Sequence, residues 1–508
     1  MKRLIIAGLL LLTSLSLFAC ENNTTSDTLT SITTTTTTTS ETTTSTTSID
    51  VSQTEVFGYT SNTAGLFSDI EYISDWDKGA LTSTFINVDD FQTFQTFYGT
   101  GAALTYSSAY VINQSPDRDE IINYLFSESG LHIQLVRLTV GASDFVPSSV
   151  GHYTYDDSPN NTADMELNYF SLEQDQIIFD IIEQALEINP DIVFLAAPWS
   201  APAWMKTNKN LYGGALSTIY YNSYANYLIR YLQEMENMGI HIKYLSIQNE
   251  PYYAPYDYPG MTWTIDTTKI FIRDFLGPKL VENGLTTSIM IWDHNPVDNN
   301  GNLIDYPVRV LNNEETASYV GAIGVHCYTG DDADMYDFLD YLHENNPEME
   351  VFMTECTAVT TYKNLSQNME WSLRRMYLET YNRFASGTTY WNMVLDPVGS
   401  VHDGGCSNCT GLLSVPIDGS SGYTVEADAY VTGHFSKDIM SGATRIYTKA
   451  NNTGLLVTGF KDQNGKITLV IFNDSVARTT TINWRNHSFA IALPQSSLTT
   501  VYWTVEEE

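Results

Sequence analysis

Short apolar runs alternate with longer amphipathic stretches between about residue 97 and residue 395. Eight runs have the length and composition of strands: 98–103, 133–138, 192–197, 244–248, 288–292, 322–327, 351–354 and 388–393. Between them, apolar positions recur at helical spacing in 176–188, 221–238, 268–282, 333–344 and 371–386. Eight strand–helix repeats over about 300 residues predict an α/β fold, a (β/α)8 TIM barrel. A doubly wound open sheet is the alternative, but no Gly-rich dinucleotide turn follows the first strand.

Beyond about residue 425 the pattern changes to short runs punctuated by Asn, Gly and Asp. The runs 444–447, 455–460, 466–472, 479–484 and 497–503 are typical of strands, and residues 462–465 (DQNG) suit a hairpin turn. The pattern predicts an appended antiparallel β-sandwich over residues 426–508. Residues 51–95 lack helical periodicity and are expected to add strands to the same sandwich, which leaves residues 96–425 for the barrel.

The first twenty residues have the proportions of an export signal. Lys2 and Arg3 precede an apolar stretch that is too short for an ordinary membrane span. Residues 17–20 (LFAC) resemble the lipobox of bacterial lipoproteins, which places the lipid on Cys20; a simple cleaved signal peptide is the alternative. Residues 21–50 contain 16 Thr and 5 Ser, so this linker is expected to be disordered. We expect a secreted protein, lipid-anchored on the extracellular face of the cell membrane.

The charge balance narrows the choice of partners. The formal net charge is −36 at pH 7, and no cluster of Lys and Arg stands out. This argues against nucleic acid as a partner, because phosphate binding needs clustered basic residues. It also disfavours strongly acidic polysaccharides as substrates. The 33 Tyr and 9 Trp are generous for this length, and such rings line sugar sites, although most aromatic side chains pack in a core.

Cys406 and Cys409 lie two residues apart in a Gly-rich segment, residues 404–409 (GGCSNC). A zinc site normally needs a second such pair or nearby His ligands, and a redox pair is expected beside a βαβ unit. In an exported protein, a small loop disulfide and two free thiols remain as alternatives.

Two carboxylates follow apolar strands of the predicted barrel. Glu250, in residues 248–251 (QNEP), follows the fourth strand, and Glu355 follows the seventh. In this fold, functional residues come from the carboxyl ends of the strands. Each Glu alone is as well explained by a partly buried ion pair with Arg, but the two together favour chemistry.

Glycoside hydrolysis explains why two carboxylates are needed. The reaction passes through an oxocarbenium-like state and requires an acid for the leaving oxygen and a second carboxylate on the opposite side. When the two groups lie about 5–5.5 Å apart, the second attacks directly and configuration is retained. The strand positions, with the family resemblance given below, favour retention.

Polar side chains at other strand ends fit the same site. Arg137, at the second strand, is expected to keep a carboxylate ionised, with a structural ion pair as the alternative. Tyr328, beyond the sixth strand, is expected to donate a hydrogen bond to Glu355. The neighbouring His326 is either a site residue or a satisfied structural histidine. Asn249 is placed to hold a sugar hydroxyl, a contact that strengthens in the transition state.

Trp199 and Trp391 end the third and eighth predicted strands. Their rings are expected to form walls of a sugar-binding subsite, because a pyranose has an apolar face. The alternative is that both rings belong to the core.

At these residues the sequence resembles glycoside hydrolase family 30, the glucosylceramidase-like group with catalytic Glu residues on strands four and seven. The resemblance runs from about Gly99 to Trp503. It rests on ordered motifs: 99–105 (GTGAALT), Arg137 with 144–145 (DF) and 153–155 (YTY), 198–208 (PWSAPAWMKTN), 248–251 (QNEP), 354–355 (TE), 390–396 (YWNMVLD) and 433–437 (GHFSK).

The resemblance implies a retaining β-glycosidase with Glu250 as acid/base and Glu355 as nucleophile. It implies that the sugar subsite is shaped by Arg137, Asp144, Trp199, Asn249, Asp293, Tyr328 and Trp391. No metal or organic cofactor is implied. The expected substrates are β-glucosidic, either glucosylceramide-type glucosides or β-1,6-linked glucan, with β-xylosides and other β-glycosides as the alternative.

The sequence departs from the family pattern beyond the sixth strand. The family usually has Trp between the His and Tyr of that strand, and this chain has Cys327, while Cys356 directly follows Glu355. A Cys327–Cys356 disulfide and two separate thiols both remain open.

Two other classes of protein are alternatives: a surface carbohydrate-binding lipoprotein with an inactive barrel, and a cell-envelope adhesin on the Thr-rich linker. The presence of both Glu residues argues against each.

Overall fold

The computed structural model describes residues 50–51, 54–70, 73, 75–78, 82–359 and 365–504. The predicted signal segment 1–20 with Cys20, and the linker 21–50 except Asp50, lie outside the described residues. In the part of the chain that is described, no helix is both long enough and apolar enough to cross a membrane.

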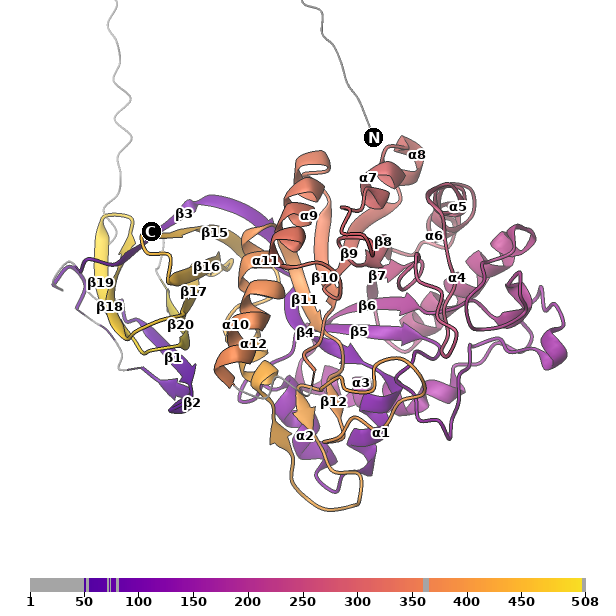
Figure 1. Cartoon of the computed structure of the whole chain (residues 1–508), viewed down its shortest axis with the longest axis horizontal. Helices are drawn as coiled ribbons and strands as arrows, with labels where there is room; N and C mark the ends of the chain where they lie inside the picture. Colours follow the sequence, from indigo (N-terminus) through magenta and orange to yellow (C-terminus); the bar gives the residue numbers. More distant parts are fainter. Residues whose placement is uncertain are drawn as a thin grey trace, which may run out of the picture. The chain divides into compact units, whose positions relative to one another are not determined.

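Eight parallel strands close into a barrel in the order β10-β11-β4-β5-β6-β7-β8-β9 (Figure 1). The strands are β4 (Gly99–Leu104), β5 (Leu135–Val140), β6 (Val193–Pro198), β7 (Ile242–Ser246), β8 (Ser288–His294), β9 (Val320–His326), β10 (Glu350–Glu355) and β11 (Ala385–Tyr390). Every residue of β4, β5 and β11 is buried, as expected for parallel strands covered on both faces. The predicted barrel is confirmed.

Helices surround the barrel because each presents one apolar face to it. In α3 (Gln176–Ile188) the buried residues recur at helical spacing, from Ile178 to Ala185. The other helices are α1 (Tyr106–Gln114), α2 (Arg118–Phe126), α4 (Tyr221–Asn237), α5 (Ile265–Phe271), α6 (Gly277–Glu282), α7 (Tyr306–Leu311), α8 (Glu314–Ala317), α9 (Asp332–Asn345), α10 (Leu365–Arg375), α11 (Leu378–Asn382) and α12 (Ala427–Ser436). A π-helical segment, Ile272–Leu276, joins α5 to α6.

A nine-stranded sheet, in the order β19-β18-β3-β15-β16-β17-β20-β1-β2, forms the second layer of the molecule. Its strands are β1 (Phe57–Asn62), β2 (Gly65–Asp69), β3 (Phe85–Thr96), β15 (Thr444–Ala450), β16 (Leu455–Lys461), β17 (Lys466–Asn473), β18 (Arg478–Trp484), β19 (His487–Leu493) and β20 (Ser497–Thr504). The pairs are antiparallel except β3 with β18. The N-terminal strands thus lie beside the C-terminal ones, as Figure 1 shows.

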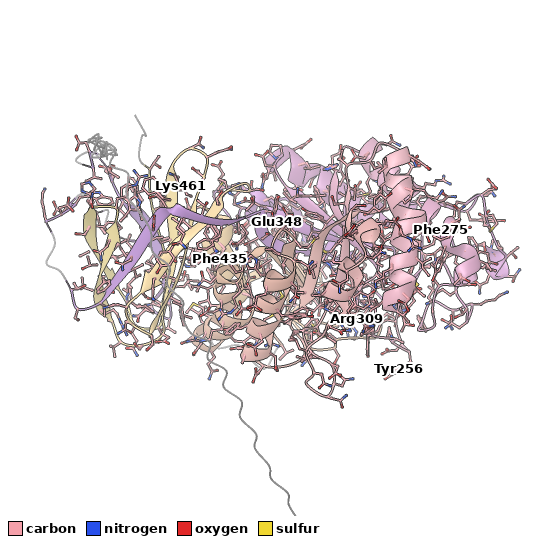
Figure 2. All side chains as sticks on the ribbon, turned by 90° about the horizontal axis from the view of Figure 1, so that it is seen from above. Tyr256, Phe275, Arg309, Glu348, Phe435 and Lys461 are labelled. Atoms are coloured by element: carbon pink, nitrogen blue, oxygen red, sulfur yellow. A yellow bond between two sulfur atoms is a disulfide. The ribbon has the colours of Figure 1, made fainter. Side chains whose placement is uncertain are left out.

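Aromatic side chains pack where the sheet meets the barrel helices. Phe435 of α12 lies in this region (Figure 2), and its ring centroid is 5.4 Å from those of both Tyr377 and Tyr381. Tyr381 in turn contacts Phe460 of β16 at 5.8 Å. This apolar contact joins the sheet to the barrel on the side of α11.

The structure corrects the predicted helix over residues 371–386. The helix α10 ends at Arg375, α11 is a separate short helix, and β11 already begins at Ala385. The small residues at the start of β11 are required by its packing: a side chain at Gly387 would meet Leu135, Phe352 and the backbone of β4. The strand β19 was also missed, because its outward positions 490 and 492 are alanines, which hide the alternation of apolar and polar residues.

Both cysteine pairs are joined as disulfides. Cys327 is bonded to Cys356 and Cys406 to Cys409, with Cα atoms 5.3 and 5.7 Å apart. Three short strands, β12 (Val394–Leu395), β13 (Leu413–Ser414) and β14 (Thr424–Val425), form a small sheet near the second disulfide.

Candidate active site

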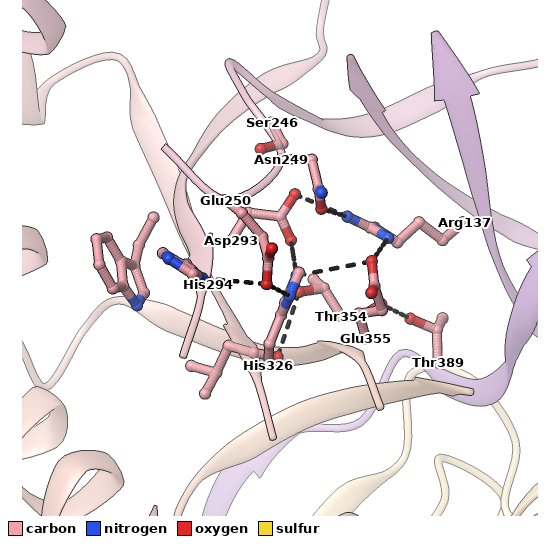
Figure 3. Close-up of polar contacts among 12 residues, drawn as sticks. Arg137, Ser246, Asn249, Glu250, Asp293, His294, His326, Thr354, Glu355 and Thr389 are labelled. Atoms are coloured by element: carbon pink, nitrogen blue, oxygen red, sulfur yellow. Dashed lines mark hydrogen bonds and ion pairs between the residues drawn. The ribbon is translucent and has the colours of Figure 1, made fainter. Parts of the chain in front are cut away.

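The two predicted catalytic carboxylates lie at the carboxyl ends of the barrel strands (Figure 3). Glu355 is the last residue of β10, whereas Glu250 lies four residues beyond the end of β7. Glu250 has φ 50° and Asp293 has φ 52°, a left-handed conformation that is costly for residues with a Cβ. The backbone N–H of Glu250 donates to the carbonyl oxygen of Asp293 at 3.0 Å, which fixes this turn.

Glu355 receives one hydrogen bond on each carboxylate oxygen. Arg137 Nη1 donates to Oε2 at 2.7 Å, and the Tyr328 hydroxyl donates to Oε1 at 2.9 Å. The Glu355 residue is 6 % exposed, so little water competes with these donors. The charged donor makes the stronger of these two hydrogen bonds, and together they hold both carboxylate oxygens in place.

Arg137 connects several of the predicted residues. It is 1 % exposed, and its Nη2 donates to Asn249 Oδ1 at 2.8 Å and to Asp293 Oδ2 at 3.0 Å. The guanidinium carbon lies 5.0 Å from the ring centroid of Trp199 and 5.6 Å from that of Trp391, and the two indoles stack at 5.2 Å. Arg137 lies within β5 rather than at its end, so its long side chain reaches the site from inside the barrel.

The imidazole of His326 lies between Asp293 and Glu250. Its Nε2 is 3.1 Å from Asp293 Oδ1, and its Nδ1 is 3.1 Å from Glu250 Oε1. Burial lowers the pKa of His326, but the charge of Glu355 and the hydrogen bonds to Asp293 and Glu250 raise it to about 9. The imidazole is therefore protonated at neutral pH and donates from both nitrogens.

Asp293 is the buried acceptor of this network. It receives hydrogen bonds from Arg137, His326 and the Thr354 hydroxyl, the last at 2.6 Å. Burial raises the pKa of Asp293, but the charge of Arg137 and the donors around it outweigh that effect and lower the pKa. Asp293 thus acts as the fixed negative charge that holds Arg137 and His326 in place.

Glu250 is surrounded differently from Glu355. Its Oε1 lies 3.1 Å from the Nδ1 atoms of both His294 and His326, and Asn295 Nδ2 donates to it at 3.4 Å. Burial raises the pKa of Glu250, but His294 and then His326 outweigh burial, so the pKa is lowered in the free protein. Because the pKa of Glu250 is lowered and that of His326 is raised, the proton of this pair resides mainly on His326 in the free protein.

Glu250, His294 and His326 also form a possible donor set for a transition metal. Their ligand atoms lie within 4.8 Å of one another among the described residues. Metal ligands must be deprotonated, however, and His326 holds its proton up to a pKa of about 9.

Asp144 lies beside the loop that carries the second disulfide. The Cys406 backbone N–H is 3.5 Å from Asp144 Oδ2, and the Asp403 N–H donates to the Asp144 carbonyl at 2.8 Å. Burial, followed by the negative charge of Glu355, raises the pKa of Asp144 to about 8. Asp144 is therefore protonated at neutral pH, and its hydroxyl is a donor in the site.

The structure brings nine of the ten predicted protein residues into one contact network: Arg137, Trp199, Asn249, Glu250, Asp293, His326, Tyr328, Glu355 and Trp391. Asp144 joins them through its charge interactions with Glu355 and Glu250. Sequence reasoning missed His294 and Asn295. The signal was present, because residues 293–295 (DHN) are a polar run directly after the predicted strand 288–292.

A closed eight-stranded barrel with two carboxylates at its strand ends is an architecture of glycoside hydrolases. Residues 97–439 match the model of the glycosyl hydrolase family 30 TIM-barrel domain, and residues 442–501 match that of the family 30 β-sandwich domain. The chain belongs to glycosyl hydrolase family 30 and is a β-glycoside hydrolase.

Relatives agree with this assignment. The endo-1,6-β-D-glucanase neg1 of Aspergillus fumigatus is 30% identical over 447 residues, which cover 82% of this chain and 87% of the relative. The lysosomal acid glucosylceramidase of Mus musculus is 26% identical over 416 residues, covering 78% and 77%. A solved endo-β1,6-glucanase structure, BT3312, superimposes with a TM-score of 0.82 at 26% identity, over 89% of this chain and 100% of that one.

The raised pKa of Asp144 makes a prediction about stability. An unfolded Asp ionises near pH 3.9, whereas Asp144 in the folded protein ionises at about 8. The Asp144 carboxyl group therefore lowers the free energy of unfolding progressively as the pH rises from about 4 to about 8. We expect Asp144→Asn to unfold at a higher temperature than wild type at pH 8, with a difference that shrinks toward pH 4.

Thermal unfolding across this pH range measures the effect. Asp403→Asn is the matched control, because it removes a charge from the neighbouring loop at a side chain that is 37% exposed. A difference between Asp144→Asn and wild type that is the same at pH 4 and pH 8 would contradict the assignment.

Proposed function

We propose that this protein cleaves β-glucosidic bonds with retention of configuration, with Glu355 as nucleophile and Glu250 as acid/base. The observation that carries the proposal is the unequal environment of the two carboxylates. Glu355 is paired with a guanidinium and a hydroxyl group, whereas Glu250 lies against two imidazoles, one of which, His326, carries a raised pKa of about 9. Two carboxyl groups whose surroundings separate their protonation states take different roles in acid–base chemistry.

In the first step, ionised Glu355 attacks the anomeric carbon and the glycosidic bond breaks. The leaving oxygen takes the proton from Glu250, and a covalent glycosyl ester forms on Glu355. Arg137 and Tyr328 hold the Glu355 carboxylate in one orientation, so the attack starts from a fixed geometry. In the second step, Glu250 removes a proton from water, which hydrolyses the ester and restores the enzyme.

The supply of the proton depends on His326. In the free protein the proton resides mainly on the imidazole side of the Glu250–His326 pair, as the opposite shifts of their pKa values indicate. A bound glycoside excludes water from Glu250, which favours the neutral carboxyl group. The proton then passes from His326 Nδ1 to Glu250 Oε1 across the 3.1 Å contact and on to the leaving oxygen.

The sugar ring is held by groups around the nucleophile. Asn249 and protonated Asp144 supply hydrogen-bonding groups for sugar hydroxyls. Trp199 and Trp391 are each only 2 % exposed and stack on one another beside Arg137, so they pack as core side chains behind these polar groups. A few convergent polar groups backed by aromatic side chains are typical of a small-ligand site.

Two relatives and one solved structure support a β-glucosidic substrate. The names of the Aspergillus fumigatus relative and of the solved structure BT3312 specify endo-1,6-β-glucanase activity, and that of the mouse relative specifies glucosylceramidase activity. We take β-1,6-linked glucan as the first substrate to test, with glucosylceramide second. A neutral polysaccharide also suits a chain with a net charge of −36.

The place of action follows from the N-terminal sequence. We propose that Cys20 carries a lipid and that residues 21–50 tether the enzyme to the outer face of the cell membrane. An enzyme held in this way acts on glycans that reach the cell surface.

Activity on a substrate panel tests the function. Wild type is expected to hydrolyse a fluorogenic β-glucoside and at least one of β-1,6-glucan and glucosylceramide; a β-xyloside tests the alternative specificity. Glu355→Gln is expected to lose about three or more orders of magnitude in kcat, because an amide cannot form the ester. Glu348→Gln is the control, because this exposed residue precedes β10 at the opposite end of the barrel strand (Figure 2). A folded wild type that is inert on the whole panel would favour a carbohydrate-binding protein.

Chemical rescue tests the role of Glu250. With a natural glucan, Glu250→Ala is expected to lose about 10²–10⁴-fold in kcat, because the leaving oxygen needs a proton. With a dinitrophenyl β-glucoside, whose leaving group needs none, the first step is expected to survive. Azide should then accelerate turnover and yield the β-glucosyl azide, measured by NMR. Azide that leaves the rate unchanged, or an α-glucosyl azide, would contradict the assignment.

A further inference from the structure

The Cys327–Cys356 disulfide joins the residues next to two groups of the site. Cys356 directly follows Glu355, and Cys327 directly precedes Tyr328. The disulfide is buried, with Cys327 5 % and Cys356 0 % exposed. The mechanism proposed above gives it no chemical role.

The backbone pairing of the two strands ends just before the disulfide. In the β9–β10 ladder, Met353 pairs with Val325, the register then shifts, and the last pair is Glu355 with His326. Both cysteines lie one residue beyond that pair. The covalent bond therefore continues the connection between the strands where their hydrogen bonds stop.

The carbonyl groups of the two cysteines anchor neighbouring elements. The Cys356 carbonyl accepts a hydrogen bond from the Trp391 N–H at 2.8 Å, and the Cys327 carbonyl accepts one from Arg375 Nη2 at 2.9 Å. Arg375 also donates to the carbonyls of Thr329 and Gly330 at 2.7 and 3.0 Å. The disulfide thus lies at a junction of β9, β10, β11 and the end of α10.

The position of the Tyr328 side chain depends on this junction, because packing alone does not fix it as it fixes a core residue. It is 43 % exposed, so packing restricts its side chain only on one side. Its position is set by the backbone: the Tyr328 N–H donates to Asn295 Oδ1 at 2.7 Å, and the preceding residue is held by the disulfide. The 2.9 Å contact from its hydroxyl to Glu355 therefore rests on the fixed distance between the two strand ends.

We propose that the Cys327–Cys356 disulfide is a positioning element that holds Tyr328 against the Glu355 carboxylate, so that reducing it slows turnover. The proposal rests on the function proposed above. Reduction by a dithiol transfers two electrons: the S–S bond breaks, two thiols form on the protein, and the reagent becomes a cyclic disulfide. Cys327 lines a cavity of about 490 Å³ together with Gly330, Trp371 and Arg375, whereas the disulfide itself is buried.

Kinetics of the reduced enzyme test the proposal. The full chain carrying Cys406→Ser and Cys409→Ser is treated with dithiothreitol, and alkylation with mass spectrometry reports the state of Cys327 and Cys356. Within this variant, reduction is expected to lower kcat about tenfold or more with a smaller change in KM, because misplacing a catalytic group by about 1 Å is costly. Reoxidation should restore kcat, which separates loss of position from loss of fold.

A double-mutant cycle reports on Tyr328 itself. Tyr328→Phe should lower kcat in the oxidised enzyme by about the same factor as reduction does, because both remove the hydroxyl group from Glu355. Reduction of Tyr328→Phe should then add little. Cys327→Ala with Cys356→Ala should reproduce the reduced state, with folding checked by thermal unfolding.

The outcomes separate this proposal from the proposed function. If the oxidised wild-type enzyme cleaves no β-glycoside, the proposed function is wrong. If the enzyme is active and its kcat does not change on verified reduction, the positioning role is wrong. Equal losses on reduction in wild type and in Tyr328→Phe would show that the disulfide does not act through Tyr328, and would also overturn the proposal.

Discussion

The buried guanidinium of Arg137 is the constraint on which the site depends. A positive charge that is 1 % exposed inside a barrel is tolerated only when it is paired and fully hydrogen-bonded. Asp293 and Glu355 supply the pairing charges and Asn249 a further acceptor. These partners come from β8, from β10 and from the segment after β7. Pairing the one side chain on β5 therefore aligns four parts of the barrel at once.

The same arrangement separates the roles of the two carboxyl groups. Glu355 is held by a guanidinium and a hydroxyl group, one on each carboxylate oxygen, whereas Glu250 is placed against His294 and His326. His326 lies between them, with Nε2 4.0 Å from Glu355 Oε2 and Nδ1 on Glu250. In the free protein the proton of the Glu250–His326 pair resides mainly on His326, so Glu250 becomes the acid of a double displacement when that proton passes to it.

Sequence periodicity predicted the eight barrel strands because buried parallel strands are continuous apolar runs, and strand ends then indicated Glu355, Tyr328 and Trp391. It failed where tertiary packing overrides local pattern. Residues 371–386 have helical spacing, yet β11 begins at Ala385 because the barrel needs small residues there. The bonding of Cys327 to Cys356 and the approach of Cys406 to Asp144 depend on side-chain directions that a sequence does not contain.

The central claim is that Glu355 becomes covalently bonded to the sugar, and trapping that ester tests it most directly. A dinitrophenyl β-glucoside with fluorine in place of the hydroxyl next to the anomeric carbon forms the ester but hydrolyses it slowly, because fluorine destabilises the oxocarbenium-like state. Mass spectrometry of the digested protein is expected to find one fluoroglucosyl group on the peptide containing Glu355. Label on Glu250, or an enzyme that turns over glucosides yet never carries label, would contradict the account.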